Sequence, residues 1–347
     1  MSDQSNHATH TTAVSQHPGK LRIAVYNYRD FDEAPYFTKF SEVYGAELVI
    51  IREAPSVENA ALAAGCQGVT VITTAITEDI IRIWKEVGVK HISTRTIGYD
   101  HVDLEAARRF GITVSNVSYS TGSVADYTVM LILMALRKMK MIMRRADAMD
   151  YSLPGSIGRQ IGDLTVGVVG TGRIGEHVIR NLSGFGCRIL ASDPYENENV
   201  KRYASYTDLN TLLRESDVIT FHVPALDETH HIVNRETLAV MKDGVVLVNT
   251  ARGSVIDTPA LLDALESGKV GAAALDVIEN ELGIFYGDYK YKVIGHREMS
   301  ILKDLPNVLM LPHMAFYTEN AVSDMVEHSI ASIAMEARGG QSPKRVC

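Results

Sequence analysis

Cysteine is scarce in this sequence, and its spacing suggests no structural role. The three cysteines, Cys66, Cys187 and Cys347, are an odd number and lack the close pairing that is typical of a metal-binding motif. We therefore expect free thiols in a reducing compartment, which predicts a cytoplasmic protein.

The sequence also lacks a basic excess and a long apolar run. Its formal net charge of −8 argues against nucleic acid or an anionic membrane as the main partner. The most hydrophobic segment, residues 129–136, has only about half the length of a membrane span and predicts a buried helix. Residues 1–20 have neither the basic start nor the apolar core of a secretory leader, so we expect a disordered tail. Its histidines His7, His10 and His17 are not expected to bind a metal.

What is present is the composition of a globular protein. With 347 residues, of which 46% are hydrophobic and 22% charged, the chain is long enough for two compact domains. From Leu21 onward, short apolar strands alternate with helices, which predicts an α/β fold with a parallel sheet covered on both faces. The expected strands are 21–28, 47–51, 68–74, 90–94 and 112–116, and the expected helices are 34–44, 77–87 and 102–110.

A long, methionine-rich helix is expected from about Ser123 to Met149. Part of this segment is apolar on nearly every side, and such a helix must be covered all round. Core packing accounts for some of its side chains, and a second subunit could cover others. The sequence therefore predicts a homodimer.

A glycine-rich turn links a strand to a helix in the second half of the chain. Gly170, Gly172 and Gly175 lie between the apolar run 165–169 and a helical pattern over 173–185. In this arrangement the glycines allow a tight turn, close approach of a pyrophosphate and close packing of helix on strand. A second strand ends at Asp193, which would bind the ribose hydroxyls and repel a 2′-phosphate. The sequence therefore predicts NAD as the cofactor.

Further strands and helices follow, so the second domain is expected to be a dinucleotide fold of six or seven strands. Within it, Thr258 is the expected N-cap of a helix with Pro259 at its first position. The final amphipathic helix, 323–338, is expected to return to the first domain. The predicted organisation is a tail at 1–20, a discontinuous substrate domain at 21–118 and 317–347, and a cofactor domain at 119–316.

Three charged or titratable side chains follow predicted strands of the second domain. They are Arg252, Glu281 and His313. Because parallel strands end at one edge of their sheet, these side chains can meet beside the nicotinamide. Arg252 could hold a carboxylate and polarise a ketone, and His313 could supply the proton that accompanies a hydride. Glu281 could fix the tautomer of His313. We therefore predict hydride transfer to a 2-oxo acid.

Several blocks together resemble the D-2-hydroxyacid dehydrogenase family. The similarity extends from Leu21 to the last helix, and within the family it is strongest to D-lactate dehydrogenases, including those of vancomycin-resistance clusters, and to phenyllactate dehydrogenases. The resemblance implies a Rossmann NAD-binding domain and a flavodoxin-like substrate domain. The shared blocks are 94–103, 116–120, 123–128, 170–175, 248–253, 274–281 and 311–318.

Matching positions carry the family's roles onto this sequence. Arg252 becomes the substrate-binding arginine, His313 the acid and base, and Glu281 its partner, whereas Glu279 lies two residues too early for that role. The other implied substrate contacts are the backbone N–H groups of Ile97 and Gly98, and the side chains of Tyr119 and Phe316. The implied cofactor contacts are Gly170, Gly172, Arg173, Ile174, Gly175, Asp193, Val223, Pro224, Thr250, Ala251, Arg252 and Asp276.

The resemblance leaves the substrate open. Ile76 falls where some D-lactate enzymes place an aromatic pocket residue, so the pocket could also accept larger acids. We expect a D-lactate dehydrogenase acting on pyruvate, with a phenyllactate or branched 2-hydroxyacid dehydrogenase and a glyoxylate or hydroxypyruvate reductase as enzyme alternatives. An NAD-sensing protein similar to the family's corepressors is the alternative of another class. The adjacent His230 and His231 are not expected to bind a metal.

Overall fold

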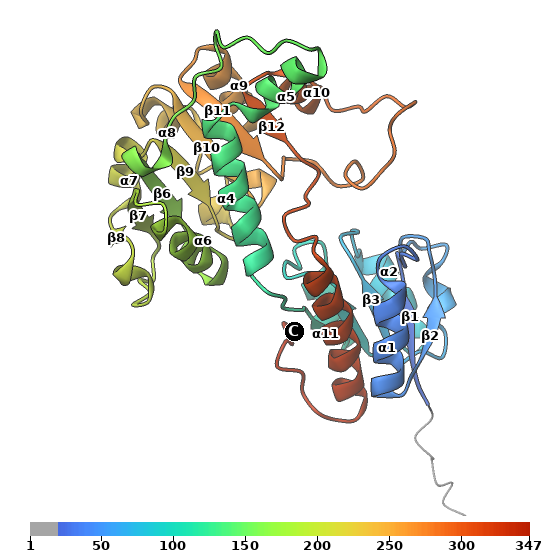
Figure 1. Cartoon of the computed structure of the whole chain (residues 1–347). Coiled ribbons are helices and arrows are strands. Elements are labelled where there is room, and N and C mark those ends of the chain that lie inside the picture. Colours follow the sequence, from blue (N-terminus) through green and yellow to red (C-terminus); the bar gives the residue numbers. More distant parts are fainter. Residues whose placement is uncertain (1–19) are drawn as a thin grey trace, which may run out of the picture.

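The protein consists of two parallel β-sheets, each covered by helices on both faces. The computed structural model describes residues 20–347, and the predicted tail at 1–20, with its three histidines, lies outside these residues except for Lys20. Figure 1 shows two bodies between which the chain passes twice, once before α4 and once between β12 and α11. The expected α/β class is confirmed.

The smaller sheet has five strands in the order β2-β1-β3-β4-β5, and all of its pairings are parallel. This is the strand order of flavodoxin-like folds, as the resemblance implied. Its strands are β1 (Leu21–Val25), β2 (Ala46–Ile50), β3 (Gly68–Val71), β4 (His91–Thr94) and β5 (Thr113–Ser115). The helices interleaved with them are α1 (Ala34–Tyr44), α2 (Glu78–Glu86) and α3 (Leu104–Phe110).

The last helix, α11 (Glu319–Ala337), packs on this smaller sheet although it follows the larger one in sequence. Figure 1 shows it beside α1. Side chains of β1 alternate between two cores, so that Ile23 and Val25 face α1 and α11. Val326 and Ile330, one helical turn apart on α11, complete that core. The smaller sheet is therefore covered on one face by the C-terminal part of the chain.

The larger sheet has seven parallel strands in the order β12-β11-β10-β9-β6-β7-β8. Counted from β6, six of them follow the Rossmann order 3-2-1-4-5-6, which confirms the predicted dinucleotide fold. The strands are β6 (Thr165–Val169), β7 (Arg188–Ser192), β8 (Ser205–Tyr206), β9 (Val218–Phe221), β10 (Val245–Asn249), β11 (Val270–Leu275) and β12 (Val308–Met310). Its helices include α6 (Arg173–Ser183), α7 (Leu209–Glu215), α8 (Arg235–Val240), α9 (Thr258–Glu266) and α10 (Arg297–Asp304).

The prediction of a single long helix at 123–149 is wrong in one respect, because the segment forms two helices. Its first part, α4 (Gly122–Leu136), packs against α6, β10 and β11, as expected for a buried helix. Lys138 then adopts φ 53°, and α5 (Met139–Asp147) starts in a new direction. The Lys140 ammonium holds α5 near α10 by donating to three backbone carbonyls, those of Lys303, Leu305 and Val308. None of residues 20–347 belongs to a helix long and apolar enough to cross a membrane.

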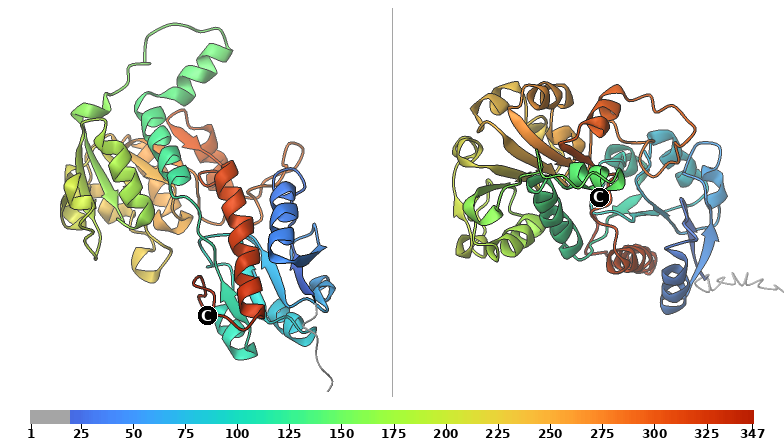
Figure 2. Two further views of the ribbon diagram at one scale, coloured as in Figure 1. Left: turned by 60° about the horizontal axis from the view of Figure 1, so that its bottom comes forward. Right: turned by 45° about the horizontal axis from the view of Figure 1, so that its top comes forward.

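The segment from α5 to about residue 158 stands off the body of the larger domain (Figure 2). Tyr151 and Leu153 are 78% and 85% exposed, and Met149 and Ile157 are similarly exposed. Exposed apolar side chains on a projecting segment are typical of a surface that binds another chain.

The start of α9 differs by one residue from the expectation. Its N-cap is Asp257, whose carboxylate accepts a hydrogen bond from the Ala260 N–H, and Thr258 is the first helical residue. The Thr258 side chain instead donates to Glu279. Both residue types cap helices well, so the sequence alone did not distinguish them.

Candidate active site

A cavity of about 480 Å³ lies between the carboxyl edges of the two sheets. The smaller sheet contributes the loop that contains Ile97 and Gly98, and the larger sheet contributes Arg252, Glu281 and His313. The structure therefore brings together the three predicted catalytic side chains and the predicted carboxylate-binding loop.

His313 and Glu281 form a hydrogen-bonded pair. The distance from His313 Nδ1 to Glu281 Oε1 is 2.5 Å, and Glu281 Oε2 accepts a hydrogen bond of 2.8 Å from the Ile278 N–H. A carboxylate fixed in this way orients the imidazole and selects the tautomer with its proton on Nδ1. The other ring nitrogen, Nε2, is then available to exchange a proton with a substrate.

Asp276 fixes the turn that presents His313. Its carboxylate oxygens accept hydrogen bonds from the N–H groups of Met314, at 2.8 Å, and Ala315, at 2.9 Å. Its carbonyl accepts from the His313 N–H at 2.7 Å. These bonds hold His313 at φ 53°, a conformation that is costly for a residue with a side chain. Burial raises the pKa of Asp276, and the two hydrogen bonds oppose that shift. The predicted cofactor residue thus also has a positioning role.

Arg252 reaches across the cavity to the predicted carboxylate-binding loop, which contains Ile97 and Gly98. A Cβ atom on Gly98 would lie 1.6 Å from Arg252 Nη2, so only glycine allows the guanidinium this close to the loop backbone. Arg252 Nε also lies 3.4 Å from Asp100 Oδ1. Asn249 braces the strand end that carries Arg252, because it accepts from the Ala251 N–H and donates to the Arg252 carbonyl. The guanidinium is therefore placed where it can contact a bound carboxylate or ketone.

Hydrogen bonds to its carbonyl groups also hold the predicted carboxylate-binding loop in place. Asn116 donates to the Ile97 carbonyl at 2.8 Å, and the Thr96 hydroxyl donates to the Gly98 carbonyl at 2.6 Å. Within residues 20–347, no hydrogen bond uses the N–H group of Ile97 or Gly98. Two free N–H groups beside a guanidinium can bind a carboxylate.

An apolar wall closes one side of the cavity. Tyr119 and Phe316 have ring centroids 6.4 Å apart and pack with Ile72 and Met325. Burial raises the pKa of Tyr119 to about 12, so its hydroxyl stays neutral. The prediction for Ile76 is wrong, because that side chain is 1% exposed in the core of the smaller domain, outside the cavity lining. Ile72, directly after β3, faces the cavity instead, whereas the chain has already turned into the core at Ile76.

Tyr286 and His101 line the cavity, and sequence reasoning missed both of them. The Tyr286 hydroxyl donates to the His313 carbonyl at 2.9 Å, and its backbone lies at φ 68°. Burial raises the pKa of Tyr286 and lowers the pKa of His101 to about 4, so both are neutral. Tyr286 lies far along the loop after β11, which has no periodic pattern there, so the sequence contains no signal that could have identified it.

The glycine turn fits a dinucleotide. Gly170 has φ +91°, and a Cβ there would lie 2.6 Å from the His222 carbonyl oxygen. A Cβ on Gly175 would lie 2.0 Å from the Gly170 carbonyl oxygen, whereas one on Gly172 would have no neighbour within 4 Å. Two of the glycines are thus required by packing, and the third leaves open space in front of the N-terminus of α6. That space suits a pyrophosphate.

The other predicted cofactor residues lie at strand ends and at the start of α6. Asp193 accepts hydrogen bonds from the Thr171 and Tyr195 N–H groups, which places its carboxylate at the end of β7 beside the glycines. Arg173 and Ile174 begin α6, Val223 and Pro224 follow β9, and Thr250 and Ala251 follow β10. Of these, Ile174 and Thr250 line the cavity. The start of α6 therefore reaches the cavity that contains Arg252, Glu281 and His313.

Comparison with known proteins agrees with this geometry. Residues 129–315 match the family described as D-isomer specific 2-hydroxyacid dehydrogenase, NAD binding domain. A D-specific alpha-keto acid dehydrogenase of Enterococcus faecium is 45% identical over 311 residues, which cover 89% of this chain and 95% of the relative. An aromatic 2-oxoacid reductase of Clostridium sporogenes is 40% identical, with 94% of this chain and 100% of the relative covered.

A solved structure shares the whole architecture. The D-lactate dehydrogenase of Treponema pallidum superimposes with a TM-score of 0.85 at 34% identity, over 94% of this chain and 100% of its own. The match extends over both domains and the cleft between them, so the resemblance to the family is confirmed. The chain belongs to the D-isomer specific 2-hydroxyacid dehydrogenases, which are NAD-dependent oxidoreductases.

Proposed function

We propose that this enzyme reduces 2-oxo acids with branched or aromatic side chains to the D-2-hydroxy acids, in preference to pyruvate. The observation that carries this proposal is the apolar wall of Ile72, Tyr119, Phe316 and Met325, which faces the same cavity as Arg252 and His313. A methyl group would leave most of this wall without contacts, whereas a larger apolar side chain would remove more of it from water.

Different residues of the cavity bind the substrate, polarise its ketone and transfer the proton. The N–H groups of Ile97 and Gly98, together with Arg252, bind the substrate carboxylate, and Arg252 also polarises the ketone. Bound NADH supplies the hydride. His313 Nε2 donates a proton to the developing alkoxide oxygen, and Glu281 stabilises the imidazolium and holds its orientation. For oxidation of the hydroxy acid, neutral His313 accepts that proton.

Pyruvate is the second candidate, and it was the first choice on sequence resemblance. The similarity in fold to a D-lactate dehydrogenase favours it. The similarity in sequence to an aromatic 2-oxoacid reductase favours the larger acids instead. Ile72 also favours the larger acids, because it adds an aliphatic surface to the wall beside the Tyr119 and Phe316 rings.

The domain limits and the assembly state are part of the same proposal. Residues 21–118 and 317–347 form the substrate domain, 119–316 form the cofactor domain, and the enzyme is a cytoplasmic homodimer. The exposed apolar side chains of the projecting segment, among them Tyr151 and Leu153, support a dimer contact there. Leu153→Glu should shift the enzyme toward the monomer in analytical ultracentrifugation, and an unchanged dimer would exclude this segment as the contact.

A substrate panel tests the proposed preference. NADH oxidation is followed with pyruvate, 2-ketoisocaproate, phenylpyruvate and hydroxypyruvate, and each product is analysed for chirality. We expect D-products and a kcat/KM that is at least tenfold higher for 2-ketoisocaproate or phenylpyruvate than for pyruvate, which corresponds to about 1.4 kcal/mol. A preference for pyruvate would reject the larger substrate, and failure of all four acids would reject the reaction.

A further inference from the structure

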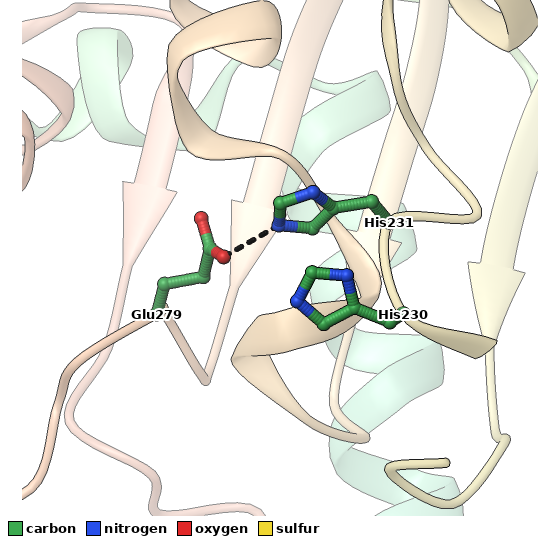
Figure 3. Close-up of side chains that lie close together, drawn as sticks. All are labelled: His230, His231 and Glu279. Carbon is green, nitrogen blue, oxygen red and sulfur yellow. Dashed lines mark hydrogen bonds and ion pairs between the residues drawn. The ribbon is translucent and has the colours of Figure 1, made fainter. Parts of the chain in front are cut away.

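Three potential metal ligands converge at the edge of the catalytic cavity. His230 and His231 lie in the loop after β9, and Glu279 follows β11. One nitrogen from each histidine and a Glu279 oxygen all lie within 4.8 Å of one another. Figure 3 shows the Glu279 carboxylate directed at the His231 ring, with the His230 ring alongside. Only the two histidines are neighbours in sequence, and the fold supplies the carboxylate as the third ligand.

Two imidazoles and one carboxylate are a ligand set that Zn²⁺ prefers, with water as the fourth ligand. With bonds of about 2.0–2.2 Å, the ligand atoms around a tetrahedral ion lie about 3.4 Å apart. Glu279 Oε1 and His231 Nε2, which are 2.6 Å apart, therefore separate when the ion binds, and a nitrogen of His230 completes the site. His230 is exposed, and within residues 20–347 its ring makes no hydrogen bond, so it is free to move. Its ring centroid is already 3.8 Å from that of His231.

The other two ligands are held in place. Glu279 Oε2 accepts hydrogen bonds from the Thr258 N–H, at 3.1 Å, and from the Thr258 hydroxyl, at 2.8 Å, while Oε1 lies 2.6 Å from His231 Nε2. The His231 backbone donates to Ser254 and accepts from Asn234. Hydrogen bonds of this kind orient metal ligands and strengthen metal binding.

We propose that His230, His231 and Glu279 bind a divalent transition-metal ion of the Zn²⁺ type at the edge of the cavity. His231 ligates through Nε2, so any proton on that nitrogen passes to Nδ1 or to solvent when the ion binds. Glu279 ligates through Oε1, and Thr258 retains its bonds to Oε2. No oxidation or reduction is involved.

The position of this site gives the ion a route to the catalytic arginine. A Cβ on Gly253 would lie 2.1–2.4 Å from backbone atoms of Ile278 and Glu279, so the strand end after Arg252 is packed directly on the segment that carries a ligand. Movement of Glu279 toward an ion is therefore transmitted to the Arg252 loop. We expect the ion to inhibit turnover by raising KM for the 2-oxo acid, and this second effect rests on the proposed function.

Binding is tested with Co²⁺, whose visible absorption reports its coordination. The full chain is used with His7, His10 and His17 replaced by glutamine, which removes other histidines capable of binding the ion. We expect stoichiometric binding with the absorption of a four-coordinate site. His230→Gln should weaken it at least tenfold, and Thr258→Val, which removes only a bond to Glu279, should weaken it about tenfold.

His177→Gln is the matched control, because His177 belongs to α6 and bonds to Thr121, outside the three ligands. It should leave Co²⁺ binding unchanged. Absence of stoichiometric binding, or equal binding by the parent and His230→Gln, would overturn the site. These measurements need no turnover, so they are independent of the proposed reaction. If Zn²⁺ raises KM equally in the parent and in His230→Gln, the link to Arg252 is wrong.

Discussion

The two sheets have similar winding but different contents at the point where the strand order reverses. In the larger sheet this point lies between β6 and β9, where Gly172 leaves open space. In the smaller sheet it lies between β1 and β3, and the Arg95 side chain fills it. Arg95 donates to the Tyr26 carbonyl at 2.8 Å, to the Thr70 hydroxyl at 3.2 Å and to Glu33 at 2.9 Å.

The difference shows that topology offers a ligand site and side chains decide whether it is used. Arg95 and Glu33 are both fully buried, so the smaller sheet contains an ion pair where a flavodoxin-like fold could bind a phosphate. It contributes backbone N–H groups, part of the apolar wall, and the side chains of Asp100 and His101 to the cleft. The larger sheet contributes Arg252, Glu281 and His313.

The largest expected effect tests whether proton transfer belongs to the larger sheet alone. His313→Gln should lower kcat by about 10²–10⁴-fold, because the proton donor is lost, while NADH binding measured by fluorescence is preserved. His101→Asn is the control from the smaller domain, and its kcat should change less than about tenfold, because neutral His101 is not expected to transfer a proton. Similar losses of kcat in both variants would show that proton transfer does not depend on the larger domain alone.

The next effect concerns the buried ion pair. Arg95→Met leaves Glu33 with a buried charge whose partner is partly lost, and should lower the free energy of unfolding by about 3–5 kcal/mol in urea titrations. Arg52→Met removes the exposed pair with Asp30 and should lower the free energy of unfolding far less, because water already screens that pair. Equal costs would show that the smaller sheet does not depend on Arg95.

Two glycine substitutions test the larger sheet in the same way. Gly175→Ala should destabilise the fold by about 1–3 kcal/mol, since its Cβ would overlap the Gly170 carbonyl. Gly172→Ala meets no protein atom, so it should leave thermal stability nearly unchanged but weaken NADH binding at least tenfold in fluorescence titrations. If Gly172→Ala binds NADH normally, the open space is not the pyrophosphate site.

The smallest effect compares two histidines, one in each domain, that each have a buried ring nitrogen. Burial lowers the pKa of His222 to about 3 and that of His101 to about 4, so both are neutral in the fold. The unfolded chain binds protons at these residues below about pH 6.5, so stability falls as the pH falls from there. Each histidine should contribute about 1.4 kcal/mol per pH unit, down to about pH 4 for His101 and about pH 3 for His222.

Urea unfolding at pH 6.5 and pH 5.5 measures this contribution. His222→Asn and His101→Asn should each show a smaller loss than the parent between these two pH values. An unchanged loss in either variant would mean that the histidine in question is not kept neutral by the fold.

Most of the architecture could be predicted, because parallel strands buried on both faces appear as short apolar runs between helices. The break after α4 could not be predicted, since it depends on the contacts of Lys140 with carbonyls far along the chain. The start of α9 was one residue off, because Asp257 and Thr258 are both good caps.

The part of the site that could be predicted consists of charged or titratable residues that follow the end of a strand. Arg252, Glu281 and His313 were identified in this way, and the structure brings them into one cavity. The prediction that Ile76 lines the pocket was wrong, because the path of the loop after β3 decides which side chain faces the cleft. Tyr286 was missed because its place depends on a single hydrogen bond between distant segments.

The packing of α11 on the smaller sheet also bears on how the protein is made. The core around Ile23 and Val25 is complete only when Val326 and Ile330 have been synthesised, and most of the chain lies between these two pairs. At about 5–20 residues per second, the part of that apolar face that α11 covers stays exposed on the ribosome for tens of seconds, with only α1 packed beside it. The larger domain can thus finish folding while the smaller one still exposes part of its apolar face.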